Sequence, residues 1–473
     1  MTYSVQPATA GSLSPRHAGR LVLAVLTAAL LAGCSSLGKY EAPSMAVPTT
    51  FAASGGGKSV DNSQTTWWLA FRDKQLNALI ERGLAENLSI AQAVERINEA
   101  NAGAMGASAS FLPSVSGTSS ARVEQKGDAD ATSSVTHGGS ASWVLDLFGQ
   151  GGSARAAAQA KLDAAYYSVD AARLTFLSEV TNAYIDLRYA QESLALTRSG
   201  LATRQQTLKL TQTLLDSGAG SQLDVLQAQG ALDAASLQLP GLELSFIAGV
   251  NRLATLTAQF PQAIEKDLQK GAPQPWPRVK VNAGIPADLI RQRPDIKGAE
   301  RAVMAAAANA RITEAAMYPS LTLSGSIGLV QASGGNVGSW GFGPTLNLPF
   351  LDGGKSKAGH TAALSQLEQA YLSWQQTVRA AIEETENALA AVRRDGRTID
   401  GANKVKQTAT QQLELARYRY ESGEGQILDV LNAERSLFDA QGQVASAAQR
   451  YASNYVRLNV AIGGGISALS AAK

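Results

Sequence analysis

Four stretches of the chain alternate between apolar and polar residues with a period of two. They are residues 115–123, 141–147, 320–330 and 340–350. One face of each stretch carries Leu, Ile, Val, Trp or Phe, and the other carries mostly Ser, Thr, Gly and Asn. Such alternation is the weak signature of a transmembrane β-strand. Because polar, Gly-rich stretches at 124–136 and 331–339 separate the strands, we predict two β-hairpins.

Long helices are predicted after each hairpin. Residues 154–216 contain no proline, and at 1.5 Å per residue they would span roughly 95 Å. Apolar residues recur at every seventh position, which is the period of a supercoiled helix seam: Val180, Leu187, Leu194, Leu201, Leu208 and Leu215. A partner helix is expected at 223–259, and 355–421 followed by 427–462 repeats the arrangement. Helices of this length fit a rod or a helical barrel.

The two halves of the chain match each other at an offset of 205 residues. Leu208–Leu232 aligns with Leu413–Leu437, and Ser217-Gly218 falls on Ser422-Gly423. Each half reads as helix, β-hairpin, long helix, turn and helix. We therefore expect one repeat at 73–260 and a second at 286–463, joined by a Pro-rich linker at 261–285 and followed by a short tail at 464–473.

Four strands cannot close a membrane barrel, because single-chain bacterial barrels begin at about eight. Open strand edges within lipid would leave backbone groups unpaired, at a cost of several kcal/mol each. If the strands lie in a membrane, the chain must therefore form a ring of several copies. A trimer would supply twelve strands, although strand physics does not fix the number three. The alternative for the strands alone is a water-soluble antiparallel sheet with one wet face.

The N-terminus reads as a secretory signal peptide at 1–33. The basic residues Arg16 and Arg20 precede an apolar run at 21–31, and Leu31-Ala32-Gly33-Cys34 follows. This last sequence matches the lipobox of bacterial lipoproteins, so we expect Cys34 to be lipidated at the start of an N-terminal segment at 34–72. Ser35 fits lipoproteins sent on to the outer membrane.

Composition narrows the function classes. Removal of residues 1–33 leaves 39 basic residues against 39 acidic ones, which argues against a basic nucleic-acid surface. Cys34 is the only cysteine, and three histidines cannot build an ordinary histidine cluster. No clustered nucleophile, base or metal set is evident. We therefore expect no enzyme activity and no cofactor other than the covalent lipid.

Several motifs in order resemble one family. They are Trp67-Trp68 with Phe71, Trp143-Val-Leu-Asp-Leu-Phe-Gly149, Gly284-Ile-Pro-Ala-Asp-Leu289, Arg293-Pro-Asp-Ile296, Tyr318-Pro-Ser-Leu-Thr-Leu323 and Pro349-Phe-Leu-Asp-Gly-Gly354. Together they make the mature chain similar to the TolC-like outer membrane efflux proteins. Within that family, they resemble the NodT-type lipoproteins of drug-efflux pumps.

The resemblance implies a mainly α-helical chain with a membrane β-barrel portion. Three copies would form a 12-stranded barrel in the Gram-negative outer membrane and a long α-helical barrel in the periplasm. The implied partners are a periplasmic adaptor protein and an inner-membrane transporter of the resistance-nodulation-division class. Small toxic molecules or drugs would pass through the channel passively.

The family also suggests where function lies. The adaptor would dock at two helical turns, through Ser217, Gly218, Ala219, Ser422, Gly423 and Glu424. Just beyond the turns, a periplasmic gate would involve Asp224, Tyr420, Asp429 and Asn432. The asparagine stands where the family's strongest carboxylate ring usually has aspartate, and Gly425 stands where an arginine tether can occur. The alternative for Asp224 and Asp429 is a helix cap or an N-terminal helix acid. Independently of the family, Phe111, Phe148, Tyr318 and Phe350 lie at the helix-side ends of the four predicted strands, where an interfacial aromatic girdle would be.

Other functions remain open at this point. The nearest alternative is an outer membrane channel for type I protein secretion. A structural periplasmic coiled-coil lipoprotein is a second one, and it would make no pore. A lipid-anchored envelope enzyme is a third, and the chain offers it no evident catalytic cluster.

Overall fold

The computed structural model describes residues 45, 52, 66–278, 292–332 and 335–465 of the chain. Cys34, the signal peptide, the Gly284–Leu289 motif and most of the C-terminal tail lie outside these residues. The described part is mostly helical and divides into two compact units. Unit 1 contains residues 99–163 and 300–372, and unit 2 contains residues 66–98, 164–278, 292–299 and 373–465. The two longest helices, α4 (Gln150–Asp216) and α9 (Lys355–Glu421), contribute to both units.

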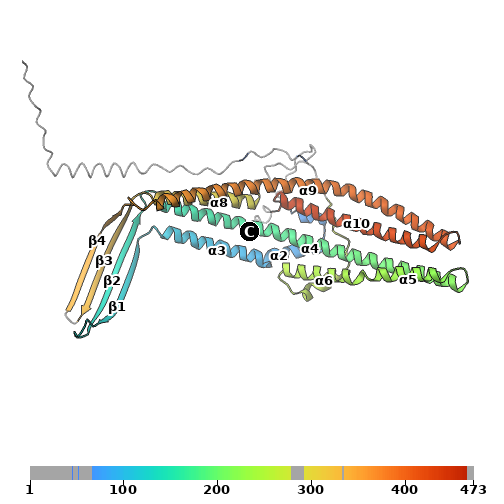
Figure 1. Ribbon diagram of the computed structural model, residues 1–473, viewed down its shortest axis with the longest axis horizontal. Helices are drawn as coiled ribbons and strands as arrows, with labels where there is room; N and C mark the ends of the chain where they lie inside the picture. The colour runs from blue at the N-terminus through green and yellow to red at the C-terminus, as the bar shows by residue number, and fades with distance from the viewer. Residues whose placement is uncertain (1–44, 46–51, 53–65, 279–291, 333–334, 466–473) are drawn as a thin grey trace, which may run out of the picture. The chain divides into compact units, whose positions relative to one another are not determined.

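Unit 1 is built around one antiparallel sheet of four strands in the order β1-β2-β3-β4 (Figure 1). The strands are β1 (Ser114–Glu124), β2 (Thr132–Leu145), β3 (Ser320–Ala332) and β4 (Gly335–Asn347). Strands β1 and β2 follow helix α3 (Leu88–Ala109), and strands β3 and β4 follow helix α8 (Pro294–Ala315). Each of these two helices has 22 residues. The sheet thus joins strands that are separated by almost 200 residues of sequence, since Thr136 pairs with Val330.

The register divides the sheet into an apolar and a polar face. Val115, Ala141, Gly325 and Phe342 pair across the four strands on one face, and the next pairs on that face include Ile327 with Trp340. On the other face, Ser116, Ser140, Ser326 and Gly341 pair in the same way. The apolar face stays exposed in the single chain: Trp340 is 80% and Phe342 85% accessible.

Aspartate and glycine residues form the turn that connects each β-hairpin to the long helix after it. Asp352 accepts hydrogen bonds from the backbone N–H groups of Gly354 and Ser356, at 2.9 and 2.7 Å. In the first half, Asp146 accepts one from Gly152 at 2.9 Å. Gly149, Gly353 and Gly354 have positive φ, which glycine adopts without a Cβ penalty. These local needs explain the Asp and Gly residues of the two strand-to-helix motifs.

The hairpin loops are shorter than the sequence pattern suggests. We expected loops at 124–136 and 331–339, but β2 begins at Thr132 and β4 at Gly335. Most of the added strand residues are polar or Gly, so apolar side chains do not mark the period of two there. Backbone pairing continues through them regardless of side chain, as in the pairs of Glu124 with Thr132 and Gln331 with Asn336.

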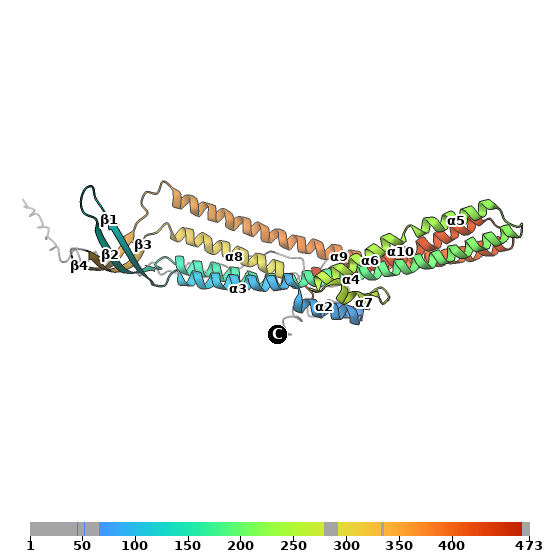
Figure 2. The same ribbon diagram turned by 90° about the horizontal axis from the view of Figure 1, so that it is seen from below.

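Unit 2 contains two helical hairpins whose turns lie at the same end in both views (Figures 1 and 2). One consists of α4 and α5 (Gln222–Ser236), and the other of α9 and α10 (Ile427–Ala461). We expected one continuous partner helix at 223–259. The structure instead ends α5 at Ser236 and starts α6 (Leu239–Leu256), with Pro240 in its first turn. Proline has no N–H for the helix ladder, so the break falls there.

A second difference lies in the expected Pro-rich linker, where the structure places a helix, α7 (Pro261–Gln269). Its first residue is Pro261, a position that suits proline because the N–H there has no helical partner. Ile264 and Leu268 are buried and belong to the main hydrophobic cluster of unit 2. Part of the linker is therefore folded against the helical core.

The main core of unit 2 gathers aromatic residues from both ends of the described chain. Trp67, Trp68 and Phe71, in the short 3-10 helix η2 (Trp67–Phe71), pack with Tyr455 of α10. The Trp67 indole donates a hydrogen bond to the Gly464 carbonyl at 3.2 Å. The short helix η2 is thus fixed to the end of the last helix, which accounts for the Trp-Trp motif.

A buried arginine organises the polar part of this core. Arg188 of α4 donates to the hydroxyl of Tyr184 at 3.0 Å, to the Lys270 carbonyl at 2.9 Å, and to the side chains of Gln75 and Gln191. Tyr184 in turn donates to Asp73 at 2.7 Å. Asp73 also caps α2 (Lys74–Glu86) through the N–H groups of Gln75 and Leu76. One network therefore joins α2, α4 and the segment after α7.

The Arg-Pro-Asp motif connects the start of α8 to two other helices. The Arg293 guanidinium contacts both carboxylate oxygens of Asp295 and lies 3.0 Å from Glu384 of α9. It also donates to the Ala461 carbonyl at the end of α10, at 2.8 Å. A cation there satisfies a free helix C-terminal carbonyl. The motif is thus a structural joint within unit 2.

Candidate functional site

The two helical turns that we predicted as docking sites have the same backbone geometry. In the first, the N–H of Gly218 bonds to the Leu215 carbonyl, and those of Ala219 and Gly220 bond to Leu214. In the second turn, Gly423 bonds to Tyr420, while Glu424 and Gly425 bond to Arg419. Gly218 and Gly423 have φ of 76° and 77°. Each turn is therefore a glycine-terminated helix end whose free carbonyls are satisfied.

The predicted docking residues form two exposed loops. All six of them, Ser217, Gly218, Ala219, Ser422, Gly423 and Glu424, are exposed. The hydroxyls of Ser217 and Ser422 are occupied, because each donates to a carbonyl three residues earlier, at 2.9 and 3.1 Å. What the turns offer to a partner is therefore backbone and small side chains, with the carboxylate of Glu424 on the second turn alone.

Gly425 has a steric reason to be glycine. A Cβ at this position would lie 3.1 Å from the Arg419 Cβ and 3.1 Å from the Tyr420 backbone nitrogen. Gly220, its counterpart in the first turn, would meet Leu214 at 3.1 Å in the same way. The tight turn therefore disfavours a side chain here, which is consistent with the missing arginine tether.

The predicted gate residues divide into two pairs. Tyr420 is buried in a cluster with Leu413, Ile427 and Val430, and it is only 9% exposed. Burial and the negative charge of Asp224 both raise the pKa of the Tyr420 hydroxyl. Asp224 therefore lies close enough to Tyr420 to affect it electrostatically. The structure thus brings together one gate residue from each hairpin.

Asp224 also has a local structural role. Ser221 and Asp224 form a capping box at the start of α5, in which each side chain bonds to the other's backbone N–H at 3.2 Å. Asp429 stands at the matching position of α10, where the N-cap residue is Gln426 and makes no side-chain cap bond. Asp429 and Asn432 are both exposed and lie one helical turn apart. In a single chain, these two face solvent.

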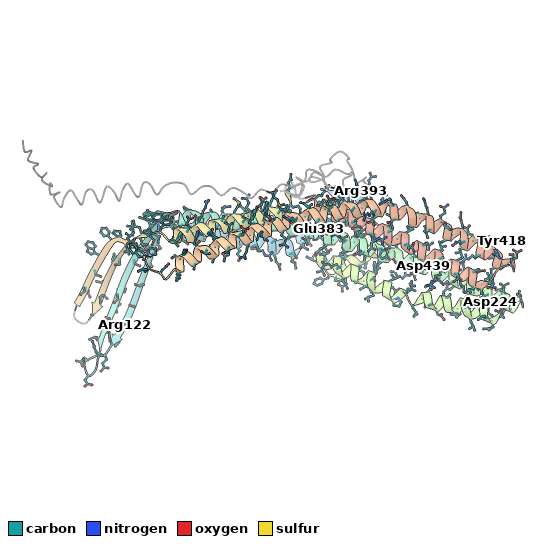
Figure 3. The ribbon with its side chains drawn as sticks, turned by 45° about the horizontal axis from the view of Figure 1, so that its top comes forward. Arg122, Asp224, Glu383, Arg393, Tyr418 and Asp439 are labelled. Carbon is teal, nitrogen blue, oxygen red and sulfur yellow. The ribbon has the colours of Figure 1, made fainter. Side chains whose placement is uncertain are left out.

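Figure 3 shows this end of unit 2 with Asp224 and Tyr418 labelled near the turns. Tyr418, Leu428, Leu223 and Leu226 are all exposed there. The end of the helices thus combines exposed apolar side chains with the carboxylates of Asp216, Glu421 and Glu424. Such a surface suits contacts with other protein helices more than it suits a soluble ligand.

Sequence reasoning missed a polar cluster about one to three helical turns away from the loops. It consists of Thr207, Arg417 and Glu434, and the carboxylate is buried. The sequence signal for this cluster is a difference between the two matching halves of the chain. The positions 205 residues before Arg417 and Glu434 are Gln212 and Gln229, so a neutral pair in the first half is replaced by a charged pair in the second.

The four aromatics predicted for the membrane interface lie at the helix-side ends of the strands. Phe148 and Tyr318 stack with ring centroids 4.9 Å apart. Phe111 packs on Gly151, where a Cβ would lie 2.6 Å from the ring. Phe350 is 82% exposed. Phe111 precedes β1 and Tyr318 precedes β3, whereas Phe148 follows β2 and Phe350 follows β4. All four therefore lie at the same end of the sheet.

Two findings bear on other kinds of site. Within the described ranges, no group of three or more His, Cys, Asp or Glu side chains is arranged to hold a metal ion. Among the helices that the structure describes, none is both long enough and apolar enough to cross a membrane.

Comparisons with known proteins place this geometry in a family. The family model described as "Outer membrane efflux protein" matches residues 79–259 and 285–464. Nodulation protein T of Rhizobium leguminosarum bv. viciae is 40% identical over 457 residues, covering 96% of this chain and 95% of the relative. The toluene efflux pump outer membrane protein TtgC of Pseudomonas putida is 30% identical, covering 94% and 95%.

Solved structures agree with the sequence comparisons. The outer-membrane channel OprN superposes with a TM-score of 0.83 at 27% identity, covering 92% of this chain and all of that one. The open state of the Neisseria gonorrhoeae MtrE outer membrane channel gives a TM-score of 0.80 at 29% identity, covering 92% and 99%. The match spans both units and both hairpins. The chain therefore belongs to the outer membrane efflux protein family.

Proposed function

We propose that three copies of this chain form an outer membrane channel that passively conducts small toxic molecules out of the cell. The observation that carries the proposal is the four-stranded sheet, with one exposed apolar face, one Ser-, Thr- and Gly-rich face, and two edge strands. An apolar face with exposed Trp340 and Phe342 suits lipid, and the opposite face suits a water-filled lumen.

The unpaired edge strands β1 and β4 are the reason to expect a closed ring of copies. Among the described residues, β1 pairs only with β2, and β4 pairs only with β3. In lipid, each unpaired backbone group costs several kcal/mol. Pairing β1 of one copy with β4 of the next removes both edges. Three copies would give twelve strands, and the matching order of elements in the two halves supports a ring of six similar repeats.

The helices would continue the conduit in the periplasm. Helices α4 and α9 both have 67 residues and begin directly after the hairpins. Each returns through a partner, α5 and α6 or α10. Three chains would therefore supply six helical hairpins for the wall of a tunnel. The end with the two turns would be the periplasmic entrance.

The entrance is where we propose the partner contacts and the gate. A periplasmic adaptor would dock on the turns at Ser217–Ala219 and Ser422–Glu424, and an inner-membrane transporter of the resistance-nodulation-division class would supply the energy. Asp224 and Tyr420 would hold neighbouring hairpins together. Asp429 and Asn432 are exposed in the single chain, so they are available to line the opening.

Lipidation of Cys34 would add a tether rather than the membrane crossing itself. The lipobox Leu31-Ala32-Gly33-Cys34 supports it. Two or more acyl chains, at about 0.8 kcal/mol per buried methylene, give stable anchoring. The packing of Trp67 and Trp68 against Tyr455 and Gly464 would then hold the lipidated segment against the helical wall.

The cargo would be set by the transporter, since the polar sheet face carries mostly small neutral residues, with Arg122 and Glu124 only near the loop end of β1. The relatives' names differ in the cargo that they state: toluene for TtgC, cations for CusC and pyoverdine for OpmQ. The exported compounds of this chain are therefore proposed only as a class. Within the channel class, type I protein secretion is the competing function, and similarity to relatives that are named as efflux proteins, TtgC at 30% and CusC at 28% identity, favours efflux.

Deletion of the gene tests the proposal. The deletion strain and a complemented strain would be compared for susceptibility to a panel of dyes, detergents, metals and antibiotics, and for proteins secreted into the medium. We expect increased susceptibility to at least one small toxic compound and an unchanged set of secreted proteins. Unchanged susceptibility to every compound, together with loss of a secreted protein, would instead establish a secretion channel.

A further inference from the structure

Among the paired strand residues, the apolar face of the sheet carries one ionisable side chain, His137 of β2. Its neighbours in the same row are Ser119 of β1 and Leu329 of β3. The Nδ1 atom of His137 lies 3.1 Å from the Ser119 hydroxyl oxygen, and the imidazole is exposed. In the described part of the chain, no hydrogen bond reaches the other ring nitrogen, Nε2. A face that lies in lipid therefore holds one hydrogen-bonding nitrogen without a protein partner, which is costly there and indicates a functional site.

The strand register gives the depth of His137 in the membrane. On β2, the apolar face runs from Leu145 at the helix end through Trp143, Ala141 and Gly139 to His137. The strand covers about 27 Å between residues 145 and 137, which is about 20 Å across the membrane at the usual tilt. The apolar band of such barrels is about 25 Å tall. His137 therefore lies about 5 Å inside the outer rim, where hydrocarbon meets lipid head groups.

The next row of the same face, towards the hairpin loops, is polar. Gln331 of β3 pairs with Asn336 of β4, and both side chains are exposed. Amide side chains donate and accept hydrogen bonds, and the free nitrogen of a neutral imidazole does one or the other. His137, Gln331 and Asn336 thus form a band of hydrogen-bonding groups at the outer limit of the apolar face. We call these three residues the polar rim.

Below His137, small residues leave a trough along the first β-hairpin. Gly117 pairs with Gly139, and Ala141 is the next residue of this face on β2. In the same row as the two glycines, Ile327 of β3 and Trp340 of β4 are 70% and 80% exposed. The apolar face is therefore low over β1 and β2 and high over β3 and β4.

Neither the backbone nor the packing of the chain requires the two glycines of the trough. Gly117 and Gly139 do not have positive φ. A Cβ at either position would meet no described atom closer than 3.9 Å. Glycine inside a strand often marks a place where a ligand approaches closely. The open space above these glycines is therefore available to a ligand.

The structure has an open hollow at this place. Two complete rows of the apolar face line it, one from Gly117 to Trp340 and one from Ser119 to Gly338, whereas the polar face contributes one row. The hollow therefore opens on the apolar side. Two strands about 4.8 Å apart make the trough about 10 Å wide, which leaves room for more than one extended acyl chain.

We propose that the trough and the polar rim bind one outer-leaflet lipid of the lipid A class, a phosphorylated disaccharide with several acyl chains. The proposal rests on the proposed function, because it needs the apolar face to lie in the outer membrane. Acyl chains lie over Gly117, Gly139 and Ala141, and the polar rim binds hydroxyl, amide or phosphate groups at the top of the chains.

Two observations favour lipid A over a phospholipid with two acyl chains. The hairpin loops lie at the end of the sheet opposite to α4 and α9, so the polar rim belongs to the outer leaflet if those helices lie in the periplasm. The polar rim also offers three separate side chains, and lipid A carries more hydrogen-bonding groups at the top of its chains than a phospholipid does.

Native mass spectrometry of the full-length trimer in detergent tests the site. Protein freed of co-purified lipid is titrated with hexa-acylated diphosphoryl lipid A and, separately, with phosphatidylethanolamine. We expect up to three lipid A molecules per trimer and weaker binding of the phospholipid. Gly139→Leu fills the trough with a side chain that lipid tolerates, and His137→Leu removes the free nitrogen. Each variant should raise the lipid A concentration at half saturation about tenfold or more.

The control is Gly341→Leu. It adds the same side chain to the opposite face, next to the row of Gly139, at a glycine with open space around it. This variant should bind lipid A like the wild type. The trimer mass and the unfolding temperature of each variant show that it is folded, so that a loss of lipid binding in Gly139→Leu is not a loss of structure.

The outcomes separate the lipid site from the channel. A wild-type trimer that conducts ions but binds no lipid A, or binds phosphatidylethanolamine equally well, would overturn the lipid site while the channel stands. An equal loss of lipid A binding in Gly341→Leu and Gly139→Leu would also overturn it, because the effect would not depend on the trough. Protein that neither forms a trimer nor conducts would contradict both proposals.

Discussion

At the scale of single residues, a side chain acts either within its own turn or helix end or through partners far along the chain. Gly218 and Gly423 follow from the turn between helices, and Asp224 follows from its place three residues after Ser221. The hydrogen bond between Thr207 and Glu434 was not predictable in this way, because the two residues are 227 positions apart. Arg188 is similar, since its partners come from α2 and from the segment after α7. Nothing in the helical pattern shows that this arginine is buried.

Replacement of Arg188 by methionine should destabilise unit 2 strongly. The change removes four hydrogen bonds and leaves the Lys270 carbonyl and the Gln75 side chain without their donor. We expect the free energy of unfolding to fall by about 3 kcal/mol. Chemical denaturation would measure it. Arg252→Met, which breaks an exposed pair with Glu179, is the control and should cost at most about 1 kcal/mol. Equal losses in the two variants would contradict this account of Arg188.

Tyr455 predicts how the stability of the protein changes in alkali. Burial raises the pKa of its hydroxyl to about 12, above the usual value of about 10. The folded form therefore keeps the proton between these values while the unfolded chain loses it. Stability is complete below about pH 10 and falls as the pH rises towards 12, by up to about 1.4 kcal/mol per pKa unit. Tyr455→Phe should flatten this fall, as measured by thermal unfolding between pH 9 and 12. A slope equal to that of the wild type would exclude the explanation.

At the scale of elements, the lengths of the long helices and their apolar spacing could be predicted from the sequence. The breaks between helices could not. The absence of proline and the seven-residue apolar spacing correctly indicated α4, and the internal repeat indicated α9, whose expected bounds of 355–421 agree with Lys355–Glu421. The break between α5 and α6 at Pro240 was missed, as was helix α7. Loop lengths were overestimated, since polar residues and Gly continue the strands through backbone pairing.

The glycines of the two turns should tolerate alanine poorly. Gly218 and Gly423 have positive φ, and a left-handed conformation costs a residue with a Cβ about 1–2 kcal/mol. Gly218→Ala and Gly423→Ala should each lower the free energy of unfolding by about that amount. Gly442→Ala is the matched control, because this glycine lies inside α10 with open space around it. It should stabilise the protein by about 0.5–1 kcal/mol. Urea denaturation distinguishes the two signs, and a stabilising Gly423→Ala would contradict the turn geometry.

At the scale of the whole molecule, the family follows from the sequence, and the number of subunits does not. The strand count requires additional copies if the sheet lies in lipid, but it does not choose three. The family model and the solved relatives supply the fold, while the assembly remains our proposal. The reason is physical, since the edges of β1 and β4 specify pairing with another copy without specifying the curvature of the ring.

The edge strands β1 and β4 allow the proposed trimer to be tested. Native mass spectrometry in detergent should give the mass of three lipidated chains. A proline in β1, Ala121→Pro, removes a backbone donor from an edge strand and should shift the protein towards single chains. The same change in the exposed loop, Ala129→Pro, is the control and should leave the trimer intact. A mass of one chain for the wild type would contradict ring closure.

The central claim is that this chain forms a passive water-filled conduit. The most direct measurement is the current through purified full-length wild-type protein in a planar lipid bilayer, without adaptor, transporter or nucleotide. We predict discrete, uniform conductance steps that persist without any energy source. Protein that is trimeric in detergent and inserts into the bilayer without giving any conductance step would contradict the claim.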